Sequence, residues 1–347
     1  MSTGANAAHF VVNTIKVSDL GTVGGSIAGA RDVNDKNEIV GWSTTASGFE
    51  HAFLYSGGTM NDIGPSISPD ESVATGINNA SQIVGWGVQF SQQMGYSWTA
   101  GVATTLFGPV PNHPPNMTSA WKINDNGDVC GAVYGPTADA ITWQASGSTV
   151  VMPTASPYAD AFDINLKSGM TGYASGNLAW RWILSGGIVT QSKQVPWPAA
   201  TGYSSGAGNA INDRGSVVGS FNFTSIGGTH AFFWDGKATK SVDLGLLPTG
   251  ITAEAQDLDE DRFIAGFASE QFQATPVAYR QRAFLYHTDF GMLALPTLRG
   301  MLKSDSCRAY ALNEWKSASS QLVIVGECDL RGNTRAVVWD AVVTLVP

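Results

Sequence analysis

A short segment of the form (Ala/Gly)-x-x-(Ile/Val/Leu)-(Asn/Asp) recurs seven times along the chain, at a spacing of about 46 residues. In six copies a glycine stands seven residues after the Asn or Asp. In the seventh copy an insertion of six residues, between Glu314 and Gln321, precedes the matching glycine, Gly326. The seven segments are Ala30–Asn34, Ala74–Asn78, Ala120–Asn124, Ala161–Asn165, Gly208–Asn212, Ala255–Asp259 and Ala309–Asn313. Such a repeat constrains the fold strongly, because each copy must form the same supersecondary unit.

The rest of each copy predicts four short strands. Turns such as Asn124-Asp-Asn-Gly127 close a hairpin between the first two strands, because Asn and Asp bond their own backbone and Gly accepts positive φ. The repeated glycine in the second strand is expected to leave room for a neighbouring sheet or a large side chain. The third strand ends in an aromatic residue, which is expected to be buried between sheets. These residues are Tyr55, Trp98, Trp143, Trp182, Trp234, Tyr286 and Trp339.

Seven such units predict an all-β fold, a seven-bladed β-propeller of four-stranded antiparallel blades in a single domain, 1–347. The segment 9–21 ends in Asp-Leu-Gly, as fourth strands of other repeats do, and is expected to close the ring. The chain ends in the strand-like Val342–Val346, so both termini offer strands to the seventh blade, and the sequence leaves open which of them is its fourth strand. The predicted repeats lie near 22–71, 72–117, 118–158, 159–206, 207–251, 252–305 and 306–347.

Charge and hydropathy exclude some functions. The formal net charge is −9, with no basic cluster, which argues against binding to nucleic acid because phosphate neutralisation needs grouped Lys and Arg. No long apolar run predicts a membrane-spanning helix, and the first ten residues do not have the pattern of a signal peptide. This leaves an intracellular protein or one whose leader is missing from this sequence.

Several sequence elements resemble those of the HAF-repeat family. They are His51-Ala-Phe, His230-Ala-Phe, Asp-Leu-Gly-Thr-Val-Gly-Gly and Ile-Asn-Asp-x-Gly-x-Val-Val-Gly. The resemblance spans the whole chain but is weaker in other repeats, where the signature reads Arg282-Ala-Phe or Arg335-Ala-Val. It implies a repeat protein, described as extracellular, and implies no activity.

The sequence contains no recognisable nucleophile elbow, zinc motif or phosphate-binding loop, so we expect no cofactor and no metal. Calcium-like Asn-Asp-x-Gly segments lack the converging acidic ligands and are interpreted as turns. His51 and His230 are expected to form structural hydrogen bonds. His113, in the proline-rich loop 109–115, is more open to a functional role.

The residues flanking the repeated Ala in the first strand vary from copy to copy, although the Ala and the aliphatic residue recur. The first strand of a propeller blade runs along the central channel, so variation there predicts either a specialised axial pocket or drifted channel lining. The candidate catalytic residues are Asp160 and Glu254. The candidate substrate-binding residues are Arg31, Trp121, Phe162, Asn209, Gln256, Arg308 and Tyr310.

Carboxylates beside aromatic rings suit acid–base chemistry near neutral pH, because desolvation raises their pKa. The preferred hypothesis is a cofactor-independent lyase, hydrolase or isomerase/cyclase acting on a small molecule. The alternative is a non-enzymatic module that binds a glycan or a protein partner. A multivalent lectin is disfavoured, because its pockets would repeat from blade to blade. A structural surface protein would be favoured by a channel filled with side chains.

The three cysteines allow at most one disulfide within the chain. Cys307 and Cys328 flank the same predicted hairpin of the seventh repeat, close enough for a disulfide if the register is right. Two unpaired thiols are the equally weighted alternative. Cys130 has no apparent partner and is expected to be a buried, inert thiol.

Overall fold

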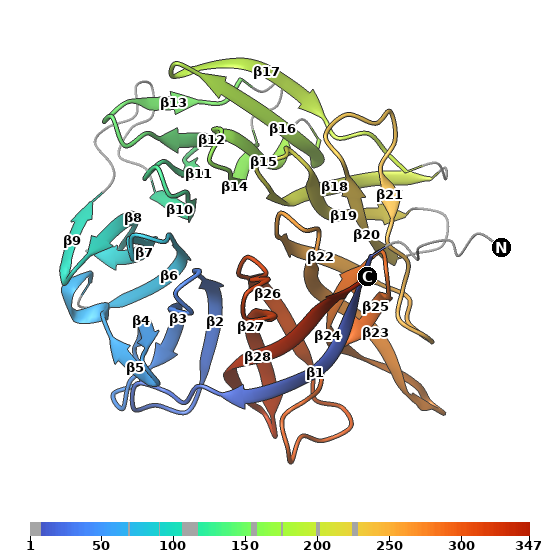
Figure 1. Cartoon of the computed structure of the whole chain (residues 1–347). Coiled ribbons are helices and arrows are strands. Elements are labelled where there is room, and N and C mark those ends of the chain that lie inside the picture. The colour runs from blue at the N-terminus through green and yellow to red at the C-terminus, as the bar shows by residue number, and fades with distance from the viewer. Residues whose placement is uncertain are drawn as a thin grey trace.

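The computed structural model describes residues 8–68, 70–89, 91–105, 117–153, 158–174, 176–198, 202–223 and 228–347. These residues form seven four-stranded antiparallel sheets arranged in a ring (Figure 1). Each sheet is one blade, with its first strand nearest the axis and its fourth strand at the rim. The chain is therefore a seven-bladed β-propeller, which confirms the fold predicted from the repeat. The described residues contain no α-helix, and their only helical segment is the 3₁₀ turn η1 (Gly64–Ser66).

The strands follow the chain from blade to blade. Blades one to three contain β2 (Ala28–Val33), β3 (Ile39–Thr44), β4 (Glu50–Ser56), β5 (Thr59–Asp62); β6 (Glu71–Ile77), β7 (Ile83–Gln89), β8 (Gln92–Thr99), β9 (Val102–Thr105); and β10 (Met117–Ile123), β11 (Val129–Tyr134), β12 (Ala138–Trp143), β13 (Thr149–Val151). Blades four to six contain β14 (Asp160–Ile164), β15 (Gly169–Ala174), β16 (Leu178–Ser185), β17 (Ile188–Gln194); β18 (Tyr203–Ile211), β19 (Val217–Phe223), β20 (Gly228–Trp234), β21 (Val242–Asp243); and β22 (Ala253–Leu258), β23 (Ile264–Ala274), β24 (Val277–His287), β25 (Gly291–Ala294). Blade seven contains β26 (Cys307–Leu312), β27 (Gln321–Leu330), β28 (Asn333–Val346) and the N-terminal β1 (His9–Asp19).

Blade seven joins the two ends of the chain. β1 pairs with β28 along its whole length, from His9 opposite Val346 to Asp19 opposite Val337. The blue β1 therefore lies outside the red β28 in Figure 1. The N-terminal strand is the fourth strand of this blade, and the C-terminal strand is its third, which answers the question that the sequence left open.

The residue after each first strand is Asn, or Asp259 in blade six, and in blades one to five the Asn both builds the hairpin turn and links neighbouring blades. In blade four, Asn165 Oδ1 accepts the N–H groups of Lys167 and Gly169, at 3.0 and 2.7 Å. Its side-chain amide donates to the carbonyl oxygen of Asn212, the equivalent residue of blade five, at 2.7 Å. The same amide-to-carbonyl bond joins blades one to two, two to three, three to four and five to six. The predicted turn chemistry is confirmed, and the blade-to-blade bond is an addition to it.

The repeated glycine lies opposite a β-bulge. In every blade the register between the first two strands shifts by one residue at the position after the repeated Ala or Gly. A Cβ on the glycine of blade four, Gly172, would lie 1.9 Å from the carbonyl oxygen of Asp160, and the other six glycines face the equivalent carbonyl at 1.9–2.1 Å. The close neighbour is thus the first strand of the same blade, instead of the neighbouring sheet expected from the sequence. Among the seven repeated glycines, only Gly85, Gly219 and Gly266 also have a large aromatic side chain close to the position of an added Cβ.

Of the seven aromatic residues expected to be buried between sheets, the five tryptophans are buried, whereas Tyr55 and Tyr286 are half-buried. Trp98, Trp143, Trp182, Trp234 and Trp339 are all buried, with exposed fractions of 8% or less. The hydrophobic contacts of these residues lie between neighbouring sheets. Burying both faces of each sheet in this way stabilises a ring that no single four-stranded sheet could form.

Cys307 and Cys328 lie directly opposite each other in β26 and β27 and form a disulfide, with the two Cα atoms 4.1 Å apart. The disulfide is therefore confirmed, and the alternative of two free thiols is wrong. Cys130 is a free, fully buried thiol, and burial raises its pKa, as expected of an unreactive position.

Candidate functional site

The seven bulged residues line one cavity on the axis, which we call the axial funnel. Its volume is about 700 Å³, within the usual range of small-molecule sites. A β-bulge re-aims a side chain out of the regular alternation, so seven bulges at one level direct seven side chains to one place. These residues are Arg31, Thr75, Trp121, Phe162, Asn209, Gln256 and Tyr310. All of them except Thr75 were among the candidate binding residues.

Further residues from the second and third strands also line the funnel, and the sequence analysis did not predict them. They are Trp42, Trp86 and Ser220, each of which directly follows the repeated glycine of its blade, together with Glu50 at the start of β4. Variation from repeat to repeat at the position after the glycine could have indicated these lining residues. That position reads Trp42, Trp86, Ala132, Tyr173, Ser220, Phe267 and Glu327 through the seven blades.

One wall, between blades seven and one, is built around Glu327. This buried carboxylate accepts hydrogen bonds from Arg31 at 2.9 Å, from Arg308 at 3.0 Å and from the Tyr310 hydroxyl at 2.9 Å. Burial raises the pKa of Glu327, but the Arg31 guanidinium and the hydrogen bonds outweigh it and hold the pKa below its ordinary value. The Arg31 guanidinium also lies over the ring of Tyr310, 4.5 Å from its centre. Two guanidinium groups thus share one carboxylate, and these charge-assisted hydrogen bonds fix the position of Glu327 in the wall.

On the opposite side, Asp160 lies behind Trp121. One carboxylate oxygen accepts the Trp121 indole N–H at 2.7 Å, and the other accepts the Tyr134 hydroxyl at 2.8 Å. Asp160 is only 4% exposed and does not line the funnel. Burial raises its pKa to about 6, although both hydrogen bonds act to lower it. The structure therefore brings Asp160 close to the funnel wall but places the Trp121 side chain in front of it.

Glu254, the second candidate catalytic residue, lines the funnel directly. It is half-buried, and no hydrogen bond or ion pair connects it to the described part of the chain. Burial raises its pKa, and the charge of Arg308 opposes that shift. Arg308 itself is bound to Glu327 and Gln281 and is not part of the cavity lining.

Two of the bulged residues also connect blades. The Thr75 hydroxyl donates to the carbonyl oxygen of Ala120 at 2.7 Å, and the Asn209 amide donates to that of Ala255 at 2.8 Å. Asn209 therefore has a structural role besides the predicted ligand contact. Phe162 packs against the Trp121 ring, with centroids 6.3 Å apart.

Lys122 separates the funnel from a second cavity of about 420 Å³ at the other mouth of the channel. Its ammonium group forms an ion pair with Asp32. Burial lowers the pKa of Lys122, but Asp32, Asp257 and Asp163 outweigh it and raise the pKa. Burial in turn raises the pKa of Asp163 to about 6 and that of Asp257 to about 7, against the opposing charge of Lys122. The second mouth is lined mainly by the Asn–Asp turns.

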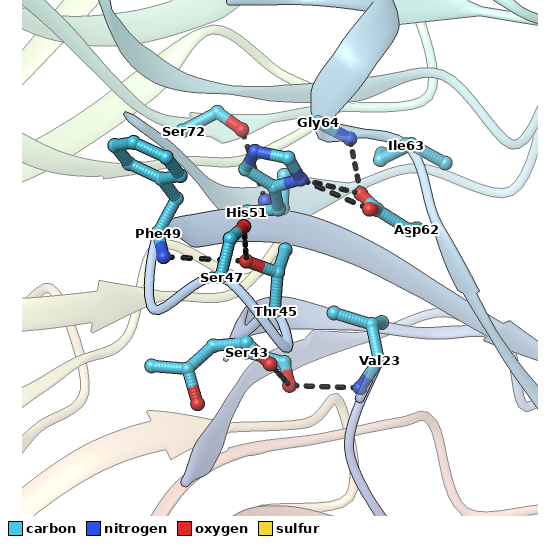
Figure 2. Close-up of polar contacts among 12 residues, drawn as sticks. Val23, Ser43, Thr45, Ser47, Phe49, His51, Asp62, Ile63, Gly64 and Ser72 are labelled. Carbon is cyan, nitrogen blue, oxygen red and sulfur yellow. Dashed lines mark hydrogen bonds and ion pairs between the residues drawn. The ribbon is translucent and has the colours of Figure 1, made fainter. Parts of the chain in front are cut away.

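The histidines of the two His-Ala-Phe segments bind aspartates of the fourth strand in their own blades. His51 Nδ1 lies 2.9 Å from Asp62, and His230 Nδ1 lies 2.8 Å from Asp243 (Figure 2 shows the first pair). The predicted structural hydrogen bonds are confirmed.

Asp62 also accepts the N–H of Gly64. The His-Ala-Phe and Asp-x-Gly signatures are thus two halves of one contact between the third and fourth strands. In blade seven Arg335 takes the place of the histidine and binds Asp19 at 2.8 Å.

His113 and its loop lie outside the described residues. Within the described part, no group of three or more His, Cys, Asp or Glu side chains is arranged to hold a metal ion. The same residues include no helix long and apolar enough to cross a membrane.

No family model matches the chain, and no curated protein matches it. Among solved structures, that of YCF48 bound to D1 peptide is similar, with 12% identity, a TM-score of 0.51 and coverage of 95% of this chain and 97% of that one. TolB from Acinetobacter baumannii has 10% identity and a TM-score of 0.49 over 80% of this chain and 65% of that one. A putative gluconolactonase has 9% identity and a TM-score of 0.46 over 96% of this chain and 94% of that one. At these identities the similarity shows the fold alone.

Proposed function

We propose that the protein binds one small molecule in the axial funnel and performs acid–base chemistry on it, as a lyase, hydrolase or isomerase/cyclase. The observation that carries this proposal is the convergence of seven different bulged side chains on one cavity of about 700 Å³. A ring that needed these positions only for packing would keep them alike from blade to blade. Aromatic walls with a few polar groups are the usual lining of a small-molecule site.

Glu254 is the proposed acid–base residue. It lines the funnel, it has no partner among the described residues, and burial raises its pKa toward neutrality. A carboxyl group of this kind can both accept and return a proton near neutral pH. Asp160 is proposed as a positioning residue, because both of its oxygens are engaged and its bond to the Trp121 N–H holds that ring in the funnel wall.

The test compares ligand capture by the wild type and by a variant with a filled funnel. Ala207 lines the funnel and Ser204, on the same strand β18, is exposed. Ala207→Trp should abolish retention of compounds that the wild type selects from a metabolite library in equilibrium dialysis. Ser204→Trp, the matched control, should retain them. Equal retention by Ala207→Trp would place the ligand site elsewhere.

Turnover distinguishes the enzyme from a binding module. A captured compound that the wild type converts, and that Glu254→Gln binds without converting, supports the acid–base role. A compound that is bound and never converted supports the non-enzymatic alternative, in which the funnel serves as a single-site module for a small molecule or glycan.

We also propose membership of the HAF-repeat family. The supporting observation is that the His51–Asp62 and His230–Asp243 contacts give the family's short signature a physical role in joining two strands. An exported location, which the resemblance implies, stays part of this proposal. Detection of the native protein outside the cell by antibody would support it, and exclusive recovery from the cytosol would contradict it.

A further inference from the structure

Two carboxylates face the funnel without a partner. Glu50 and Glu254 both line the cavity, and neither forms a hydrogen bond or an ion pair with the described part of the chain. Burial is the largest cause that raises the pKa of each, and the nearby charge of Glu71 adds to the effect at Glu50. The charge of Arg31 opposes the rise at Glu50, and that of Arg308 opposes it at Glu254, but the pKa of both stays raised. A half-buried carboxylate without an ion pair or a hydrogen bond lacks part of its hydration and gains little in return.

The two basic groups in the lining already form ion pairs with other carboxylates. Arg31 is bound to Glu327 at 2.9 Å, and Lys122 is bound to Asp32 and is surrounded by the further charges of Asp163 and Asp257. Neither cation forms an ion pair with Glu50 or Glu254, although the charge of Arg31 acts on Glu50 from a distance. In and directly around the funnel, the carboxylates of Glu50, Glu254, Glu327 and Asp32 outnumber the cations of Arg31, Arg308 and Lys122, and only Glu50 and Glu254 among these groups form no ion pair with the described residues.

The walls add aromatic rings to these carboxylates. Trp42, Trp86, Trp121, Phe162 and Tyr310 come from five different blades and all line the cavity. Cations are attracted to the faces of such rings, most strongly to Trp. The funnel already holds one example, because the Arg31 guanidinium lies 4.5 Å from the centre of the Tyr310 ring and 6.0 Å from that of Trp42.

We propose that the ligand of the funnel is a small organic cation, a protonated amine or a quaternary ammonium compound. Glu50 and Glu254 supply its counter-charge, and the rings of Trp86, Trp121 and Phe162 contact its apolar groups. An anionic ligand would be repelled by these two carboxylates, and a neutral ligand would leave both of them without an ion pair. This inference rests on the proposed function, in that it takes the funnel as the ligand site.

Three probes of nearly the same shape test the charge. Choline is the cation, 3,3-dimethylbutan-1-ol is its neutral counterpart, and 3,3-dimethylbutyrate is an anion of similar size. Binding is measured by NMR, from the shifts of the tryptophan indole N–H signals on titration to about 10 mM, enough to saturate a millimolar site. We expect choline to bind about tenfold more tightly than the alcohol, and the anion to bind most weakly.

The variants separate charge from shape. Glu50→Gln and Glu254→Gln should each weaken choline binding by about three- to tenfold and leave the alcohol nearly unaffected. Asp235→Asn, which removes an exposed carboxylate outside the cavity lining, should change neither. Ala207→Trp should abolish the binding of all probes.

The outcomes distinguish the two proposals. If the alcohol or the anion binds as tightly as choline and Ala207→Trp abolishes that binding, the funnel is the site and the ligand is not a cation. If both Gln variants bind choline like the wild type, the carboxylates are not its counter-charge and the inference fails. If none of the probes binds, or if binding survives Ala207→Trp, the funnel itself is not the small-molecule site that we propose.

Discussion

The two ends of the axial channel are built from the same repeat but differ in how closely they follow it. At the mouth lined by the Asn–Asp turns, the same amide-to-carbonyl bond links five successive pairs of blades. At the funnel, the seven equivalent positions hold seven different residues, and only Thr75 and Asn209 share a contact, a hydrogen bond to the carbonyl oxygen of the repeated Ala in the next blade. One end therefore serves the assembly of the ring, and the other is free for recognition.

The β-bulge explains how one strand can do both. Its backbone geometry recurs in all seven blades, because the repeated glycine admits the close carbonyl. The bulged side chain itself lies outside the regular pairing, so its identity can change without altering the ladder. The regular part of each strand holds the ring together, while the bulge presents a variable side chain to the axis.

The largest expected effect contrasts two tryptophans. Trp234 is fully buried and donates to the carbonyl oxygen of Ala238 at 2.8 Å, whereas Trp86 is half-buried in the funnel wall. Trp234→Ala should lower the free energy of unfolding by about 3–5 kcal/mol, and Trp86→Ala by less than half as much. Urea denaturation measures both. Equal losses would mean that the funnel wall belongs to the structural core.

The next effect concerns pH. Burial raises the pKa of Asp160 to about 6 in the folded protein, above the ordinary value of 3.8. The folded state therefore holds this proton more tightly than the unfolded state, so ionisation costs stability as the pH rises from about 4 to about 6. Asp160→Asn should gain stability relative to the wild type over that window, on the order of 2 kcal/mol, and hold the gain above it.

Thermal unfolding of both proteins at a series of pH values measures this difference. Because other buried carboxyls titrate in both proteins, only the difference between the two curves reports on Asp160. A difference that does not change with pH would contradict the raised pKa. A confirmed rise would show that the funnel end carries a destabilising group, as functional sites often do.

Two asparagines from opposite ends of the channel give a smaller contrast. Asn165 is buried and makes three hydrogen bonds, whereas Asn209 lines the funnel and makes one. Asn165→Ala should lower the free energy of unfolding by about 1–3 kcal/mol, because it leaves buried backbone groups unpaired. Asn209→Ala should cost below about 1 kcal/mol. Chemical denaturation of the pair tests the order, and a larger loss at Asn209 would reverse the comparison.

The smallest effect on stability is expected at Glu254. It is half-buried and has no partner in the described part of the chain, so Glu254→Gln should change the free energy of unfolding by less than about 0.5 kcal/mol. The same substitution should abolish turnover of a funnel substrate. A strongly destabilised variant would mean that Glu254 supports the fold, and an active one would remove it from the proposed mechanism.

The repeat predicted the blade count, the strand order and the buried tryptophans, because symmetric packing forces equivalent positions to be alike. It also pointed to the bulged residues, since these are the positions that symmetry leaves free. It did not predict which neighbours cover them. Asp160 and Glu254 occupy the same position in their blades, but Trp121 covers the first of them, and nothing covers the second in the same way. The difference arises because the bulged residue of the preceding blade is the large Trp121 beside Asp160 and the smaller Asn209 beside Glu254. The repeat shows that these positions vary, but it does not show which side chain covers which neighbour.

The pairing of β1 with β28 has a consequence for how the protein is made on the ribosome. β1 emerges before the other strands of the ring, yet its only partner among the described strands, β28, is the last of them to be synthesised. Until translation has passed Val346, both edges of β1 lack a partner, and six blades can form before the seventh. An unpaired strand is a template for association with other chains. The interval between the first and last strands is therefore the period in which a nascent chain of this protein is most exposed to aggregation or to the binding of a chaperone.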